Sequence, residues 1–487
     1  MRATLATAGT TATLAALIVV APGLSARQGL DRTRIPAPGK APDLRVPSWT
    51  KSAFPNGPQF VVSERPGLPL VSFTITFVGG ANQFEPADKK GVASLTASML
   101  SEGTKTRDGE ALSRALQLLG TSVNASIGAE TGSIGFVSTT RTFQPTLEIL
   151  VDMLRHSTFP EAALERLRAQ RLVALTQANA QPGAIADRVF NRVLYGDAHQ
   201  MGQRATEASL KAITRADVVA FHDTYFQPAR AIVTIVGDVN AVTAKSTVER
   251  VLVSGWPSPS TQKGPLAYPP VPPSRPMTIY LVDKPGAAQS TFSIGNPGPP
   301  RNTPDYFALQ VMNTILGGQF QSRLNANIRE EKGYSYGVRS GFGFGKGPGA
   351  FETGGDIVTA STDKALVEFM KELRGIQGSR PVTDEELQTA KDKLIQSLPG
   401  QFASAAQVNG AITSLLVQEL PENYYQTYAK AVSAITKDDV VRVAKKYIDL
   451  EHLAIVIVGD RATIEAPLRA TGIAPIVLLD TEGTPKS

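Results

Sequence analysis

The side chains that most often carry chemistry are few in this chain and widely separated. The 487 residues include no cysteine, and no two of the four histidines, at positions 156, 199, 222 and 452, are spaced to share one helical turn. Arg329 and Tyr336 stand seven positions apart in the stretch NANIREEKGYSYG. A guanidinium and a phenol hydroxyl can both stabilise a carbonyl oxygen on which negative charge develops. Both residue types are common, so this spacing alone identifies no site.

The composition is that of a globular protein of several domains. Apolar residues make up 42% and charged residues 19% of the chain, and its length fits two to four domains. The net charge is +6. No run of Lys and Arg is interleaved with aromatic residues, so we expect no nucleic-acid-binding face.

The first 26 residues differ from the rest. Arg2 is their only charge, an apolar run extends from Leu14 to Ala21, and small residues follow at Gly23, Ser25 and Ala26. This pattern predicts a signal peptide over residues 1–26, and an uncleaved N-terminal anchor is the alternative. We expect an exported protein, in a bacterial periplasm or outside the cell, with no other membrane attachment. The absence of cysteine, which excludes disulfides and a lipoprotein anchor, suits such a location.

Two copies of one pattern of elements follow an extended lead-in over residues 27–56. Residues 212–238 align without a gap with residues 434–460, and Ala, Ile, Thr, Asp, two Val, Tyr, Ile, Val, Gly and Asp coincide. This internal repeat predicts two similar domains, over residues 57–254 and 277–478, with a short tail at 479–487. Eight prolines lie between positions 257 and 276, which indicates an extended linker over residues 255–276.

The periodicity of apolar residues indicates an α+β fold. The stretches QFVVSE and LVSFTITFV are typical of strands, and DKKGVASLTASMLSE and GEALSRALQLLG of helices. The strand patterns at 121–127 and 132–140 are close enough to form a hairpin. We therefore expect each domain to have a mixed or antiparallel sheet with helices packed on one face.

The chain resembles the pitrilysin/insulinase family of zinc metallopeptidases over about residues 57–478. The likeness rests on FTITFVGGANQFEPADKKGVASLTASMLSEGTKTR, LVDMLRHSTFPEAALERLRAQR, YGDAHQMGQ, LGGQFQSRLNANIREEKGYSYGVRSGF and the two VGD ends. Active members carry HxxEH, in which two histidines on one helix face bind zinc and the glutamate acts as general base. Alignment through Gly91 and Gly103 places Ser94, Ala97 and Ser98 at these three positions.

None of those three residues can do the work of the motif. A serine hydroxyl is a poor zinc ligand and alanine accepts no proton. The family's third ligand is a glutamate some 75 residues later, where this chain reads AQRLVALTQANA, residues 169–180, with no carboxylate. We therefore expect no zinc in this chain, and interpret Ser94 and Ser98 as small polar residues lining an emptied cavity. The alternative, Ser98 as a hydrolytic nucleophile, lacks a base at a recognisable spacing.

The resemblance gives Arg329 and Tyr336 a role. They match an arginine and a tyrosine that, in active members, bind the carbonyl oxygen of the scissile peptide. Gly317 and Gly318, in LGGQFQSRL, match a region where non-catalytic subunits such as those of mitochondrial processing peptidase use a glycine-rich loop to handle substrate. Helix termination by glycine is the alternative for these two residues.

The resemblance implies a non-catalytic, substrate-binding subunit of a two-chain zinc peptidase. A partner of the same family would carry HxxEH and the zinc, and this chain would supply Arg329 and Tyr336. Peptides are the implied substrates. One alternative is a peptide-binding or assembly scaffold with no role in hydrolysis, and another is an enzyme with an unrecognised site.

Overall fold

The computed structural model describes residues 44–257 and 267–486. The expected signal peptide, most of the lead-in and part of the proline-rich linker lie outside the described residues. The lead-in nevertheless contributes a strand, because residues 50–53 pair with the first strand that the apolar pattern predicts.

The first half forms a mixed six-stranded sheet in the order β1-β2-β6-β3-β5-β4. Strands β2 and β6 run parallel, and every other neighbouring pair runs antiparallel. Alternating apolar residues dictate this sheet, since β2 and β3 coincide with the stretches QFVVSE and LVSFTITFV. The strands are β1 (Thr50–Ala53), β2 (Gln59–Glu64), β3 (Leu70–Val78), β4 (Asn124–Ile127), β5 (Thr131–Thr139) and β6 (Ala231–Gly237).

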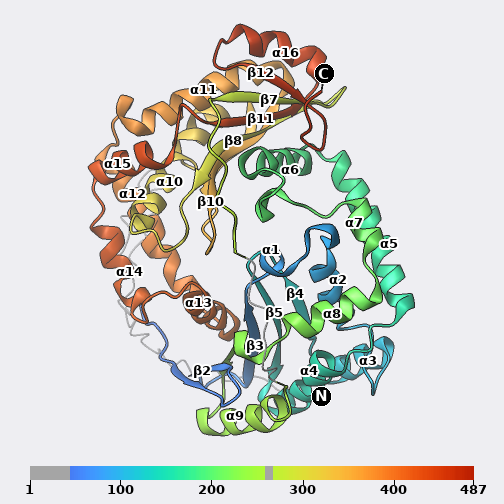
Figure 1. Ribbon diagram of the computed structural model, residues 1–487. Coiled ribbons are helices and arrows are strands. Elements are labelled where there is room, and N and C mark those ends of the chain that lie inside the picture. The colour runs from blue at the N-terminus through green and yellow to red at the C-terminus, as the bar shows by residue number, and fades with distance from the viewer. Residues whose placement is uncertain (1–43, 258–266, 487) are drawn as a thin grey trace, which may run out of the picture. The chain divides into compact units, whose positions relative to one another are not determined.

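Helices of the first half cover the outer face of this sheet (Figure 1). Phe73 of β3, Phe136 of β5 and Phe143 at the start of α4 pack their rings together at the centre of this layer. The helices of this half are α1 (Ala81–Phe84), α2 (Val92–Met99), α3 (Gly109–Leu118), α4 (Phe143–His156), α5 (Glu161–Ala180), α6 (Pro182–Tyr195), α7 (Glu207–Ala212), α8 (Arg215–Tyr225) and α9 (Ala241–Val248).

The second half repeats this plan in a sheet of order β12-β7-β11-β8-β10-β9. Strand β7 runs parallel to both β11 and β12, and the remaining neighbours are antiparallel. Five strands thus correspond to β2–β6, and the sixth comes from the opposite end of the chain. The strands are β7 (Thr278–Asp283), β8 (Gln289–Gly298), β9 (Ser335–Phe342), β10 (Gly349–Val358), β11 (Ala454–Gly459) and β12 (Ile476–Leu479).

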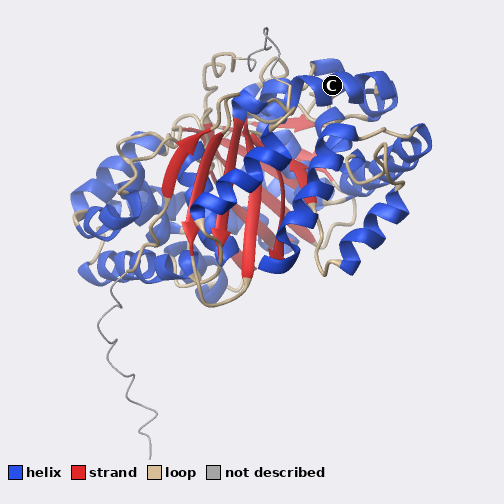
Figure 2. Cartoon of the chain, turned by 90° about the horizontal axis from the view of Figure 1, so that it is seen from below, coloured by secondary structure: helices blue, strands red, loops and turns tan. Residues whose placement is uncertain are grey.

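Helices again lie on the outer face of the second sheet, and Figure 2 shows strands with helices around them. The expected α+β architecture, with a mixed sheet and a helical layer in each half, is confirmed. These helices are α10 (Tyr306–Leu316), α11 (Thr362–Arg374), α12 (Asp384–Ser397), α13 (Ala405–Val417), α14 (Tyr424–Ser433), α15 (Lys437–Tyr447) and α16 (Arg461–Ala470).

The aligned repeat is visible in atomic detail. Helices α8 and α15 each begin with a capping box, formed by Thr214 with Asp217 in the first half and by Thr436 with Asp439 in the second. Each helix leads to a fully buried strand, β6 or β11, near the middle of its sheet. Equivalent residues therefore begin the corresponding helix in each half and form the corresponding buried strand.

One helix of each half packs on the inner face of the other half's sheet. Helix α6 packs on β8 and β11, and α13 packs on β3 and β6 (Figure 1). Asn409 of α13 donates hydrogen bonds of 3.2 Å from Nδ2 to the carbonyl oxygens of Ser72 and Thr234. Residues Leu44–Ser487 accordingly form one compact unit.

Candidate functional site

Helix α2 carries the three positions at which the sequence predicts a degenerate zinc motif. Ser94 and Ser98 are partly exposed and Ala97 is buried. The Ser94 hydroxyl donates to the carbonyl oxygen of Gly91 at 3.1 Å, and that of Ser98 donates to the carbonyl oxygen of Ser94 at 3.0 Å. Both hydroxyl protons are therefore used within the helix, which leaves neither serine prepared as a nucleophile.

Arg171 is a member of this site that the sequence did not reveal. It projects from α5, and its guanidinium donates a hydrogen bond of 3.0 Å to the hydroxyl oxygen of Ser98. Active family members are expected to place a zinc-binding carboxylate on this helix, whereas this chain places a permanent positive charge there. The only sequence cue was the arginine in the stretch AQRLVALTQANA, residues 169–180. An arginine is common on an exposed helix and therefore indicates no site by itself.

The beginning of α2 is fixed by a buried carboxylate. Glu85 accepts hydrogen bonds from the backbone N–H groups of Gly91 and Ala93, at 3.0 and 2.8 Å. Burial raises the pKa of the Glu85 carboxyl, and these two N–H groups and nearby Lys90 oppose that rise. A carboxylate at a helix N-terminus also complements the helix dipole, so the start of the degenerate helix is held in place.

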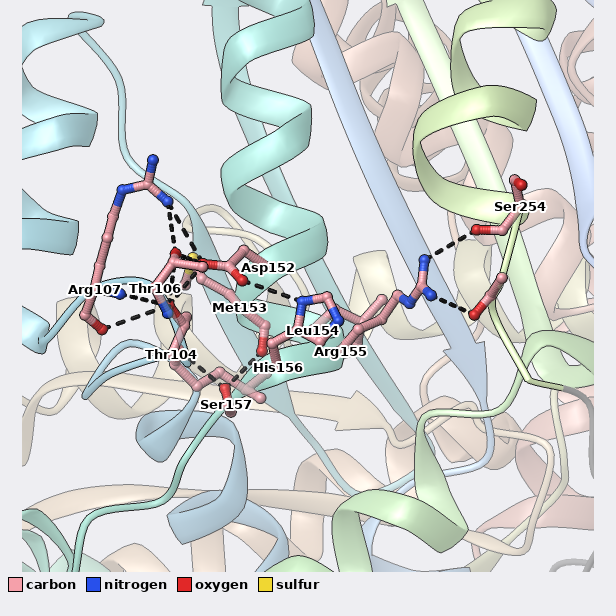
Figure 3. A network of polar contacts seen from close by, with 12 residues as sticks. Thr104, Thr106, Arg107, Asp152, Met153, Leu154, Arg155, His156, Ser157 and Ser254 are labelled. Atoms are coloured by element: carbon pink, nitrogen blue, oxygen red, sulfur yellow. Dashed lines mark hydrogen bonds and ion pairs between the residues drawn. The ribbon is translucent and has the colours of Figure 1, made fainter.

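The turn after α2 is fixed by Asp152 of α4 (Figure 3). The hydroxyl groups of Thr104 and Thr106 each donate to its Oδ2 at 2.6 Å, and His156 Nδ1 lies 3.1 Å from its Oδ1. Burial opposes ionisation of Asp152, but these hydrogen bonds hold the pKa of its carboxyl below the ordinary value. The scaffold around the degenerate helix is thus ordered at both ends.

Side chains suited to a zinc site are not gathered in the part of the chain that the structure describes. Across residues 44–257 and 267–486, no three His, Cys, Asp or Glu side chains are placed to hold a metal ion. Each histidine has a local contact: His156 with Asp152, His199 with the N–H of Met201, His222 with the carbonyl of Leu154, and His452 with Asp449. The residues present on α2 and α5 do not fit zinc.

The second set of predicted residues meets at one place. Gly317, Gly318, Arg329 and Tyr336 all line a pocket of about 590 Å³ beside strands β9 and β10. Arg329 lies on a π-helical segment, Asn325–Glu331, and Tyr336 lies on β9. The two side chains face each other, with the guanidinium carbon 5.4 Å from the centre of the tyrosine ring. The role of these residues remains a prediction.

Glycine is required at both positions of the loop for reasons of packing. A Cβ atom on Gly317 would lie 2.6 Å from the backbone nitrogen of Ser340, and one on Gly318 would lie 3.0 Å from the carbonyl oxygen of Asn313. The loop therefore packs directly against strand β9 and the end of α10. Gly317 and Gly318 therefore follow the end of α10 and also line the pocket.

Phe320 completes the surroundings of Arg329. The Phe320 ring stacks on the guanidinium, with the guanidinium carbon 4.0 Å from the ring centre. Its sequence cue was a large apolar residue two positions after Gly318. Tyr334, which lies between Arg329 and Tyr336 in the sequence, packs against the core of the second half. Another glycine-rich stretch, SGFGFGKGPGAF at residues 340–351, contains the turn between β9 and β10.

In the described ranges no helix combines the length and apolar character needed to cross a bilayer. Two family models match the chain, one within the first half and one that begins in the first half and continues into the second. Residues 61–207 match the model described as Insulinase (Peptidase family M16), and residues 212–394 match the one described as Peptidase M16 inactive domain. The chain belongs to peptidase family M16, the insulinase family, and lacks the zinc-binding motif of its active members.

Similar proteins agree with this assignment. An uncharacterized zinc protease YmxG of Bacillus subtilis is 23% identical over 80% of this chain and 92% of its own length. A non-peptidase homolog YmxG of Helicobacter pylori is 22% identical over 81% and 90% of the two chains. The solved peptidase M16 inactive domain from Pseudomonas fluorescens is 25% identical, covers 84% of this chain and 98% of its own, and superposes with a TM-score of 0.75. A protease from Helicobacter pylori, at 20% identity, shares the fold with a TM-score of 0.76 and covers 85% of this chain and 99% of its own.

Proposed function

We propose that this chain is the non-catalytic, substrate-binding subunit of a two-chain zinc peptidase. The observation that carries the proposal is the contrast between its two halves. The α2 site has hydroxyl groups and a guanidinium where zinc ligands are needed, whereas Arg329, Tyr336 and the two glycines line one pocket. A chain that keeps only the carbonyl-binding part of a site needs the other part from a partner.

The partner would be a family member that carries HxxEH and binds the zinc. When bound there, the metal supplies Lewis acidity toward water and the scissile carbonyl. The residues of this chain would act on the carbonyl oxygen. The Arg329 guanidinium and the Tyr336 hydroxyl can both donate hydrogen bonds to that oxygen as negative charge develops. Peptides are the expected substrates.

The accessibility of the two side chains supports this role. Tyr336 is 89% exposed, and the side chain of Arg329 is 23% exposed. Among the described residues, the only ion pair of Arg329 is with the exposed carboxylate of Glu330, at 3.4 Å. A surface ion pair of this kind contributes little to stability, about 0 to 1 kcal/mol. Both side chains are therefore available to an incoming peptide.

The test is an activity measurement on the reconstituted pair. The partner is obtained by co-purification with this chain from its native cell, and cleavage of a quenched fluorescent peptide is measured with each chain alone and with both. We expect cleavage to rise when this chain is added, and Arg329→Ala to lower kcat by about 10²-fold without loss of assembly. Arg141→Ala, an exposed arginine before α4 and outside the pocket, is the matched control. Full activity of the Arg329→Ala pair would instead favour an assembly scaffold.

A further inference from the structure

The exposed apolar side chains near Arg329 are unusual in their arrangement. Phe320 is 64% exposed and Tyr336 is 89% exposed, and the guanidinium carbon of Arg329 lies 4.0 Å from the centre of the Phe320 ring and 5.4 Å from that of the Tyr336 ring. Stacking on an aromatic ring orients a guanidinium without using its hydrogen-bond donors. The donors of Arg329 therefore stay available while its plane is held.

The loop that carries Phe320 is anchored on both sides. Ser340 of β9 donates from its backbone nitrogen to the carbonyl oxygen of Gly317 at 3.2 Å, and Asn325 Nδ2 donates to the carbonyl oxygen of Gln319 at 3.2 Å. Asn325 also accepts from the N–H of Val338 at 3.0 Å. Phe320 is therefore presented by a fixed loop that hydrogen bonds connect to strand β9, and its exposure is built into that loop.

The rest of the pocket suits a narrow, extended ligand. Backbone of Gly337, Gly354 and Gly355 lines it, together with the charged groups of Arg339 and Asp356. Glycine-lined walls allow a main chain to approach closely. A peptide offers a carbonyl oxygen for the guanidinium and, next to it, a side chain that can pack on an aromatic ring.

We propose that Phe320 is a specificity-determining and positioning residue, which packs against one bulky apolar side chain of an extended peptide while it holds the plane of Arg329. The proposal rests on the proposed function and deepens it, because it defines the substrates as peptides with a large apolar side chain beside the bound carbonyl. Burial of such a side chain against Phe320 removes apolar surface of both partners from water, which favours Phe or Leu over Ala at that position.

Direct peptide binding to the full chain, without a partner, tests the preference. The probes are fluorescein-labelled unstructured decapeptides that differ at one central position, which is Phe, Leu, Ala or Asp, and affinity is read from fluorescence anisotropy. We expect the Phe and Leu peptides to bind about tenfold more tightly than the Ala peptide. The Phe320→Ala variant should bind all four with similar affinity, and Leu118→Ala, an 84% exposed apolar residue of α3 outside the pocket, should keep the wild-type preference.

A second pair of variants separates apolar packing from positioning. Phe320→Leu keeps an apolar surface but loses the ring face. It should therefore keep the preference for Phe and Leu peptides, whereas kcat of the reconstituted pair should fall and KM should change less. Phe320→Tyr keeps both properties and should behave as wild type.

Three outcomes would each overturn the proposal: equal binding of all four peptides by the wild-type chain, absence of measurable binding, or retention of the preference by Phe320→Ala. So would weaker assembly of Phe320→Ala with the partner at unchanged peptide preference, because the ring would then be an assembly contact. Failure of the proposed catalytic role leaves a different pattern, in which peptide preference persists but Arg329→Ala has no effect on turnover.

Discussion

The guanidinium of Arg171 on α5 donates a hydrogen bond of 3.0 Å to the hydroxyl of Ser98 on α2. Ser98 is predicted to occupy the position at which an active family member has its second zinc-binding histidine. The loss of the metal site is therefore more than the absence of ligands, because a permanent cation lies beside the same position. A divalent ion brought there would meet charge repulsion as well as a lack of donors.

This arrangement predicts what restoring zinc requires. Ser94→His, Ala97→Glu and Ser98→His should not bind zinc stably by themselves, because Arg171 stays beside the site and no carboxylate replaces the third ligand. Adding Arg171→Ala and Ala174→Glu removes the cation and places a carboxylate on the same face of α5, one turn away. Metal analysis after dialysis should return about one zinc per chain only for the five-fold variant. Equal zinc in the three-fold variant would contradict the role given to Arg171.

The Arg329 side chain predicts a graded response in the reconstituted pair. Lysine keeps the positive charge but loses the planar fork and the stacking on Phe320, so Arg329→Lys should lower kcat by about tenfold, less than Arg329→Ala does. Tyr336→Phe removes one donor and should also act mainly on kcat, since the lost hydrogen bond is strongest in the transition state. Initial rates over a range of peptide concentrations separate kcat from KM. A change confined to KM would assign both residues to ground-state binding alone.

Asp152 predicts a pH-dependent contribution to stability. Its hydrogen bonds from Thr104 and Thr106 should make Asp152→Asn lower the free energy of unfolding by about 2 kcal/mol at neutral pH. The pKa of this carboxyl is lower in the folded than in the unfolded chain. The stabilisation is therefore fully present above the unfolded pKa and is lost as the pH falls through the folded pKa.

Denaturant unfolding at neutral pH and at about pH 3 measures this contribution. The difference between wild type and Asp152→Asn should shrink at the acidic pH. Asp88→Asn, an exposed carboxylate in the turn before α2, serves as the control and should change neither value appreciably. A difference that stays constant with pH would mean that packing, and not ionisation, explains the effect.

Much of the fold followed from the sequence because its information is local. Strands β2 and β3 coincide with two predicted stretches, and the repeat predicted helices α8 and α15 through residues that form their capping boxes. Strand β1, with the sequence TKSA, has no alternating apolar pattern and becomes a strand only by pairing with β2. The exchange of α6 and α13 between the sheets depends on tertiary packing, which periodicity does not encode.

The candidate site divides in the same way. Ser94, Ala97 and Ser98 were predicted from flanking residues, and Arg329 and Tyr336 from their surrounding stretch. The structure shows that Arg329 and Tyr336 line one pocket, and the roles of all five residues stay predictions. Arg171 was missed because the zinc motif identifies only the positions of the metal ligands. It does not indicate that a cation on α5 lies beside Ser98. Phe320 was missed because its importance lies in a contact with Arg329, nine positions away, across a turn of the chain.

The exchange of helices gives the last prediction, which concerns Asn409. This residue is 3% exposed, and its side chain ties α13 of the second half to β3 and β6 of the first. Asn409→Ala should lower the free energy of unfolding by about 1 to 3 kcal/mol, because two hydrogen bonds across the contact between the halves are lost. Since each half covers the other half's sheet, wild type and variant should both unfold in one transition, seen alike by circular dichroism and by the fluorescence of the two tryptophans. Trp256 is buried in the core of the first half, and Trp49 packs against the cluster that includes α13. Ser414→Ala, an exposed position on the same helix, should leave stability unchanged. Two separate transitions in the wild-type chain would show that the halves are independent and that the exchanged helices do not couple them.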